Sequence, residues 1–129
     1  MHPADNFKYY KNKFDQLRLE CDFLANALSD IIINLYFLGK LRGNDCATEP
    51  MVFLVSGRMY QSYLCLAKVA GVIPAVEIVF VKKQGAVRKY LDTLEQEMWT
   101  GILVICGQLY AEFHSEILST KIGRKAVII

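Results

Sequence analysis

Residues Leu54-Val-Ser-Gly57-Arg-Met-Tyr60-Gln-Ser-Tyr63 recur in type 50 positions later as Val104-Ile-Cys-Gly107-Gln-Leu-Tyr110-Ala-Glu-Phe113. In both stretches two apolar positions and a small residue precede the glycine, and a polar residue, an apolar residue and a tyrosine follow it. This order is typical of a buried strand that ends at a glycine turn and continues into a helix. The repeat therefore predicts two similar strand–turn–helix units.

The sequence around this repeat alternates between strand and helix patterns. The strand patterns cover residues 51–55, 76–81, 102–106 and 125–129, and the helical patterns cover 58–70, 86–99 and 108–119. Such alternation is typical of right-handed βαβ crossovers and a parallel sheet. We therefore predict an α/β domain over residues 51–129, a three-layer Rossmann-like or flavodoxin-like sheet of about four strands. In sheets of this kind ligands bind beyond the carboxyl ends of the strands, where the strand order reverses.

A different pattern fills the N-terminal third of the chain. Apolar residues recur at spacings of three and four from Phe7 to Leu38, without glycine or proline, which predicts one long helix or a helical hairpin that breaks near Ser29. We assign residues 1–43 to this heptad-patterned, coiled-coil-like segment and residues 44–50 to a linker. Its length suggests oligomerisation, and the alternative is that the seam is ordinary core. A homodimer would pair through Phe14, Leu17, Leu24, Leu28, Ile31 and Leu35.

Composition limits the function classes. The 129 residues are 53% hydrophobic and 22% charged, with a formal net charge of +2. This composition excludes a disordered chain, and the near-neutral balance gives no reason to expect nucleic acid or a membrane surface as partner. The four cysteines form no C-x-x-C pair, so we predict no metal site and free buried thiols. With no secretory signal pattern, the predicted location is cytoplasmic.

The first glycine turn is the best candidate binding site. Ser56, Gly57 and Arg58 would offer a hydroxyl, backbone N–H groups at a helix start and a guanidinium, a set that suits a phosphate or carboxylate. The alternative is a tight turn with a solvated arginine. The second turn would supply the other wall, with the Cys106 thiol interpreted as a small buried hydrophobe rather than a nucleophile. The predicted ligand-binding residues are Ser56, Gly57, Arg58, Cys106, Gly107 and Gln108.

Residues 51–129 resemble the N-terminal, Rossmann-like half of the formyl-tetrahydrofolate-dependent formyltransferases. The resemblance lies in Met-Val-Phe-Leu-Val-Ser-Gly at 51–57, Val-Glu-Ile-Val-Phe-Val at 76–81, Gly-Ile-Leu-Val-Ile-Cys-Gly-Gln-Leu at 101–109 and the Glu-Ile-Leu-Ser that begins at Glu116. It implies a transferase-type fold whose first turn holds substrate phosphate, with a folate or nucleotide-type ligand. The family's catalytic Asn, His and Asp have no counterparts here, because Ala126-Val-Ile-Ile129 contains neither Asn nor His.

Two functional hypotheses follow. In the first, the chain is a formyltransferase-like α/β domain that binds an anionic small molecule without the catalytic constellation, so its status as an enzyme stays open. In the second, it is a non-enzymatic homodimeric interaction or scaffold protein assembled through its N-terminal helix.

Overall fold

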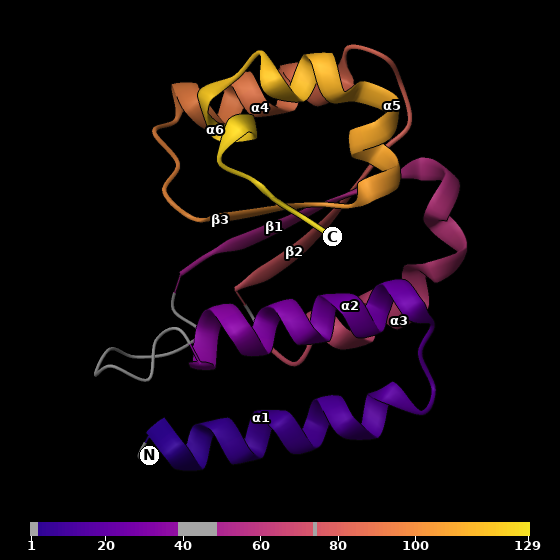
Figure 1. The fold of residues 1–129 in the computed structure, drawn as a ribbon, viewed down its shortest axis with the longest axis vertical. Helices are drawn as coiled ribbons and strands as arrows, with labels where there is room; N and C mark the ends of the chain where they lie inside the picture. Colours follow the sequence, from indigo (N-terminus) through magenta and orange to yellow (C-terminus); the bar gives the residue numbers. More distant parts are fainter. Residues whose placement is uncertain (1–2, 39–48, 74) are drawn as a thin grey trace. The chain divides into compact units, whose positions relative to one another are not determined.

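The computed structural model describes residues 3–38, 49–73 and 75–129 (Figure 1). The chain divides into two compact units that exchange segments of sequence. The first unit comprises residues 1–49 and 62–76, and the second comprises residues 50–61 and 77–129.

The four strands form one parallel sheet in the order β2-β1-β3-β4. Met51 pairs with Ile102 and Leu54 with Ile105, while Val104 pairs with Val127. This order reverses between β1 and β3, as in flavodoxin-like sheets. The predicted α/β fold class is confirmed. The strands are β1 (Met51–Ser56), β2 (Val76–Val81), β3 (Ile102–Ile105) and β4 (Val127–Ile128).

The first strand is buried over its whole length. Its sequence, Met-Val-Phe-Leu-Val-Ser, is a continuous apolar run with no alternation, which is the pattern of a strand covered on both faces. The neighbouring β3 is almost as buried, whereas residues 77–80 of β2 are partly exposed. The core of the second unit is therefore centred on β1 and β3, the two strands that carry the repeated sequence.

Three helices of the second unit lie together on one face of the sheet (Figure 1). Val87, Leu91 and Leu94 form a buried stripe on the first of them, and their spacing of four and three residues places them on one side of an α-helix. A short 3-10 helix, η2 (Gly57–Ser62), follows β1. The covering helices are α4 (Ala86–Gln96), α5 (Gly107–Leu118) and α6 (Lys121–Arg124).

The N-terminal segment of the first unit is a helical hairpin rather than one rod. Helix α1 (Pro3–Arg18) ends before a short loop, and α2 (Phe23–Ile32) runs back beside it (Figure 1). The break was expected near Ser29, but that residue lies inside α2. The break instead lies earlier in the chain, between Arg18 and Phe23. There the Asp22 side chain accepts a hydrogen bond from the Ala25 amide at 3.0 Å and so caps the start of a new helix.

Within the described residues, the first unit also contains the π-helical turn η1 (Ile33–Leu38) and α3 (Tyr63–Ala70). Helix α3 groups with the N-terminal helices, although the sequence assigned residues 51–129 to one domain. Of the six seam residues proposed for dimerisation, Phe14, Leu24 and Leu28 are buried in the single chain, and Leu17, Ile31 and Leu35 are partly buried. Most of the predicted linker 44–50 lies outside the described residues, as does Cys46.

Among the described residues, none of the helices combines the length and the apolar character that a membrane span requires.

Candidate functional site

The structure brings the two glycine turns to the same edge of the sheet. Strands β1 and β3 are parallel neighbours, so the turns that follow them both lie beyond the carboxyl ends. The Cys106 amide donates a hydrogen bond to the Leu54 carbonyl at 2.9 Å, which extends the pairing to the start of the second turn. The turns thus meet at the point where the strand order reverses, the usual ligand-binding position in such folds.

A carboxylate that is absent from the predicted site residues connects the two turns. Glu112 Oε1 accepts hydrogen bonds from the Ser56 hydroxyl and from Gln108 Nε2, both at 3.3 Å. Arg58 Nε lies 3.9 Å from the same oxygen. The Ser56 hydroxyl also accepts a hydrogen bond from the Arg58 amide at 3.3 Å. One carboxylate oxygen is therefore surrounded by a hydroxyl, an amide and a guanidinium.

The sequence held a signal for Glu112. It lies four residues after Gln108 on α5, so both side chains project from the same face of that helix. It also belongs to the repeated stretch itself. An anionic ligand favours hydrogen-bond donors and cations as its contacts, so the predicted site contains no acidic residue.

A cavity of about 410 Å³ opens beside this carboxylate. Arg58 is 78% exposed there, and Lys82 enters from the end of β2. Gly57 is required at this point, because a Cβ built on it would lie 2.3 Å from Lys82 Cγ. The Lys82 ammonium stands 5.3 Å from the centre of the Tyr60 ring, a cation–π contact. The lining residues are Ser56, Gly57, Arg58, Val81, Lys82, Glu112 and Phe113.

The predicted site residues separate into two groups. Ser56, Gly57 and Arg58 line the cavity, whereas those of the second turn do not. Cys106 is 2% exposed, and the Gly107 amide donates to the Ile129 carbonyl at 2.7 Å, so that N–H is already used inside the protein. Gln108 reaches the site only through its hydrogen bond to Glu112.

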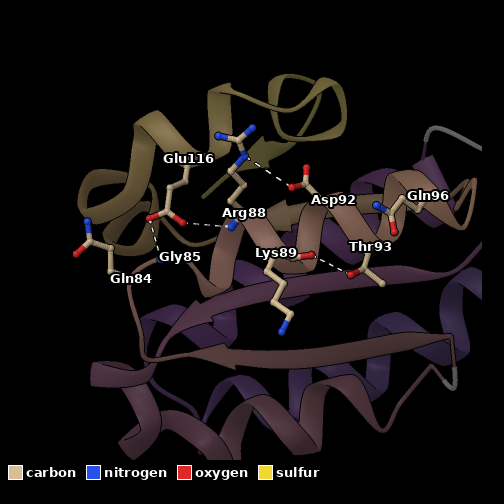
Figure 2. Close-up of a pocket in the computed structure, with 8 residues that line it drawn as sticks. All are labelled: Gln84, Gly85, Arg88, Lys89, Asp92, Thr93, Gln96 and Glu116. Carbon is tan, nitrogen blue, oxygen red and sulfur yellow. Dashed lines mark hydrogen bonds and ion pairs between the residues drawn. The ribbon is translucent and has the colours of Figure 1, made fainter.

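A second cavity, of about 610 Å³, lies beside the start of α4 (Figure 2). Glu116 extends across it from α5, and its two carboxylate oxygens accept hydrogen bonds from the Gly85 and Arg88 amides, each at 3.3 Å. Arg88 Nε in turn lies 3.7 Å from Asp92 Oδ2. Glu116 therefore acts as a helix cap supplied by another helix. Because its central groups already pair with one another, this cavity is the weaker candidate for a ligand.

Within the described part of the chain, no group of three or more His, Cys, Asp or Glu side chains is placed to hold a metal ion. No family model, curated protein or solved structure matches the chain.

Proposed function

We propose that this chain is a small-molecule-binding α/β domain that takes an anionic group, a phosphate or a carboxylate of a folate-type or nucleotide-type ligand, beside the first glycine turn. The observation that carries the proposal is the position of the Glu112 carboxylate. It is held by Ser56, Gln108 and Arg58 beyond the ends of β1 and β3. Donors that hold a carboxylate of the protein itself have the chemistry needed to hold one from a ligand.

The charge around the cavity favours an additional anion. Arg58 and Lys82 contribute two positive charges and Glu112 one negative charge, which leaves one positive charge in excess among these three residues. An incoming anion would pair with Arg58 and Lys82 and displace Glu112 from the Ser56 hydroxyl. On this proposal Glu112 acts as an internal competitor, so that its removal strengthens binding.

The formyltransferase resemblance enters the proposal only as a source of ligand chemistry. It suggests phosphate and folate as the first compounds to test. The proposal assigns no formyl-transfer step, because the chain offers no Asn or His at the family's motif position and general acid–base chemistry requires such groups in one cleft.

Thermal unfolding with added ligand tests this function. Inorganic phosphate and 5-formyltetrahydrofolate should each raise the melting temperature of the full chain, because a ligand that binds only the folded state stabilises it by about 2.7 kcal/mol at one hundred times its Kd. Arg58→Ala should abolish the shift and Glu112→Ala should enlarge it. Arg88→Ala is the matched control, since Arg88 is also an exposed arginine paired with a carboxylate.

Three outcomes would count against the proposal. The first is the absence of any shift in both the wild-type chain and Glu112→Ala. The second is a shift that Arg58→Ala and Arg88→Ala reduce equally, which would indicate nonspecific charge binding. The third is weaker binding by Glu112→Ala, which would show that the carboxylate does not compete with the ligand.

Self-association is the second candidate function, and two exposed side chains favour it. Leu19 is 91% exposed and Phe23 is 88% exposed, both at the loop of the N-terminal hairpin. We propose that a homodimer would use this loop, because half of the predicted seam is buried in the single chain. Sedimentation should then show a dimer that Leu19→Asp with Phe23→Asp converts to a monomer. A monomeric wild-type chain at high concentration would contradict it.

A further inference from the structure

Two cysteines belong to neighbouring segments of the first unit that are joined by polar contacts. Cys21 belongs to the loop between α1 and α2, and Cys65 belongs to the first half of α3. The Cys65 thiol donates a hydrogen bond to the Glu20 carbonyl oxygen at 3.6 Å, so it contacts the residue that directly precedes Cys21. Both are free and only partly buried, unlike Cys106, so the expectation of buried thiols is wrong for this pair.

The contact is held from both sides by polar interactions of neighbouring residues. The Ser62 hydroxyl donates to the Asp22 carboxylate, whose other oxygen caps α2. One turn further along α3, Lys68 Nζ lies 3.5 Å from Glu20 Oε2. The loop is thus tied to α3 immediately before and after the cysteines, and the two thiols stay close without a covalent bond.

We propose that Cys21 and Cys65 form a site of reversible oxidation, in which a low-molecular-weight disulfide converts the two thiols into an intramolecular disulfide that joins the α1–α2 loop to α3. Cys65 already contacts the residue next to Cys21, and the polar contacts on both sides keep the two segments together. Cysteines held in this way need little backbone movement to form a disulfide, whereas distant cysteines need much more. Partial exposure gives the oxidant access to the pair.

The reaction proceeds by two exchanges in which every electron is accounted for. The Cys65 thiolate attacks one sulfur of the small disulfide, forms a mixed disulfide and releases one small thiolate. The Cys21 thiolate then attacks the Cys65 sulfur and releases the second small thiolate. The two protons lost by the cysteines pass to the two departing thiolates. Two protein thiols are oxidised, and one disulfide is reduced to two thiols.

The order of attack follows from the surroundings of Cys21. Burial, the hydrogen bond to Cys65 and the nearby Cys65 and Asp22 side chains raise the pKa of the Cys21 thiol to about 11, with Lys68 acting in the opposite direction. Because the thiolate is the nucleophile, Cys21 attacks a small disulfide from solution slowly. Its attack becomes effective once the mixed disulfide on Cys65 holds the target sulfur beside it.

Trypsin cleavage leaves each of the four cysteines in a different peptide, so a disulfide between any two of them can be identified by mass. Cys21 falls in residues 19–40, Cys46 in 43–58, Cys65 in 59–68 and Cys106 in 90–121. The full chain is incubated with glutathione disulfide, its remaining thiols are alkylated, and the digest is analysed by mass spectrometry without reduction.

We expect peptide 19–40 to be joined to peptide 59–68 in a monomeric chain, with the loss of two of the four titratable thiols and full recovery after dithiothreitol. Cys46→Ser should give the same link. Cys21→Ser should instead retain glutathione on Cys65, because the resolving thiol is missing. Thiols that do not react, a link to peptide 43–58, or stable glutathione adducts on both cysteines of the wild-type chain would each overturn the proposal.

Discussion

The Ser56 hydroxyl is buried, with 1% of the residue exposed, and it donates a hydrogen bond to Glu112 Oε1 at 3.3 Å. Ser56 ends β1 in the first copy of the repeat and Glu112 lies on α5 in the second copy. This contact, together with the Arg58–Glu112 ion pair, joins the halves of the candidate site. A buried hydroxyl that loses its acceptor costs about 1–3 kcal/mol, which makes the pair relevant to stability as well as to binding.

Glu112→Ala should therefore lower the free energy of unfolding by about 1 kcal/mol, because Ser56 is left without its carboxylate partner. In a Ser56→Ala background the same change should cost clearly less, and the difference measures the coupling between the two residues. Glu112→Gln keeps an acceptor oxygen and should fall between the wild type and Glu112→Ala. Urea unfolding measures all four variants. Equal costs in both backgrounds would contradict the contact.

Removal of the Glu116 carboxylate should expose the start of α4. Two backbone amides, those of Gly85 and Arg88, would lose their acceptor, and losing a helix cap typically costs about 1 kcal/mol. Glu97 lies just after the last residue of the same helix and is exposed. Glu97→Ala is the matched control, and it should leave stability unchanged or slightly higher, because an acidic residue there opposes the helix dipole. Similar losses for Glu116→Ala and Glu97→Ala would exclude the capping role.

The two glycines of the repeat should respond differently to alanine. A Cβ on Gly57 would lie 2.3 Å from Lys82 Cγ and 3.3 Å from Lys82 Cα, whereas a Cβ on Gly107 meets nothing closer than the Ile129 carbonyl oxygen at 3.3 Å. Overpacking of this kind costs about 1–3 kcal/mol. We expect Gly57→Ala to lower the melting temperature clearly more than Gly107→Ala does. The reverse order in calorimetry would show that Lys82 does not approach the first turn.

Stability should fall at alkaline pH through Cys21. The pKa of its thiol is raised in the folded chain from 9.0 to about 11, so the folded state holds the proton more tightly than the unfolded state does. The resulting stabilisation is fully present below pH 9 and is lost as the pH rises towards 11. Urea unfolding of the reduced chain over this range measures the effect. Cys21→Ser should show a flatter decline, and an identical decline would contradict it.

The sheet could be predicted from sequence because its strands are short, apolar and separated by glycine turns. Residues 51–55 and 102–106 correspond closely to β1 and β3, and the repeat placed their turns at one edge. The fourth strand is shorter than residues 125–129 because a helical turn precedes it. The Thr120 hydroxyl caps α6 by accepting a hydrogen bond from the Gly123 amide at 3.0 Å, and this turn ends with Lys125 as its C-cap.

The hairpin and the assignment of α3 were harder to predict, because both depend on contacts between distant residues. The heptad spacing runs through Leu19–Asp22 without interruption, and only the capping geometry of Asp22 reveals the break. Similarly, nothing local to residues 63–70 indicates that the helix groups with the N-terminal hairpin. Cys65 and Lys68 both contact Glu20, which lies 45 positions before Cys65.

At the candidate site, the repeat located the edge but not the residues that fill it. Ser56 and Arg58 were found because their chemistry matched the expected ligand. Lys82 reaches the cavity from the end of β2, and Glu112 reaches it from within helix α5. Sequence periodicity shows which face of a helix carries a residue. Which side chains meet at the edge of the sheet can be known only from the tertiary structure.

The polypeptide passes between the two compact units three times, after residues 49, 61 and 76. Neither unit can therefore be produced as one uninterrupted fragment. A cut before Met51, which the sequence pattern suggests, would leave α3 in the C-terminal fragment and separate it from the N-terminal helices with which it groups. Leu66 and Val69, which are buried in the full chain, would then become exposed. Expression of separate halves is thus expected to yield aggregates, whereas a rearranged gene that fuses residues 62–76 directly to the hairpin would respect the division.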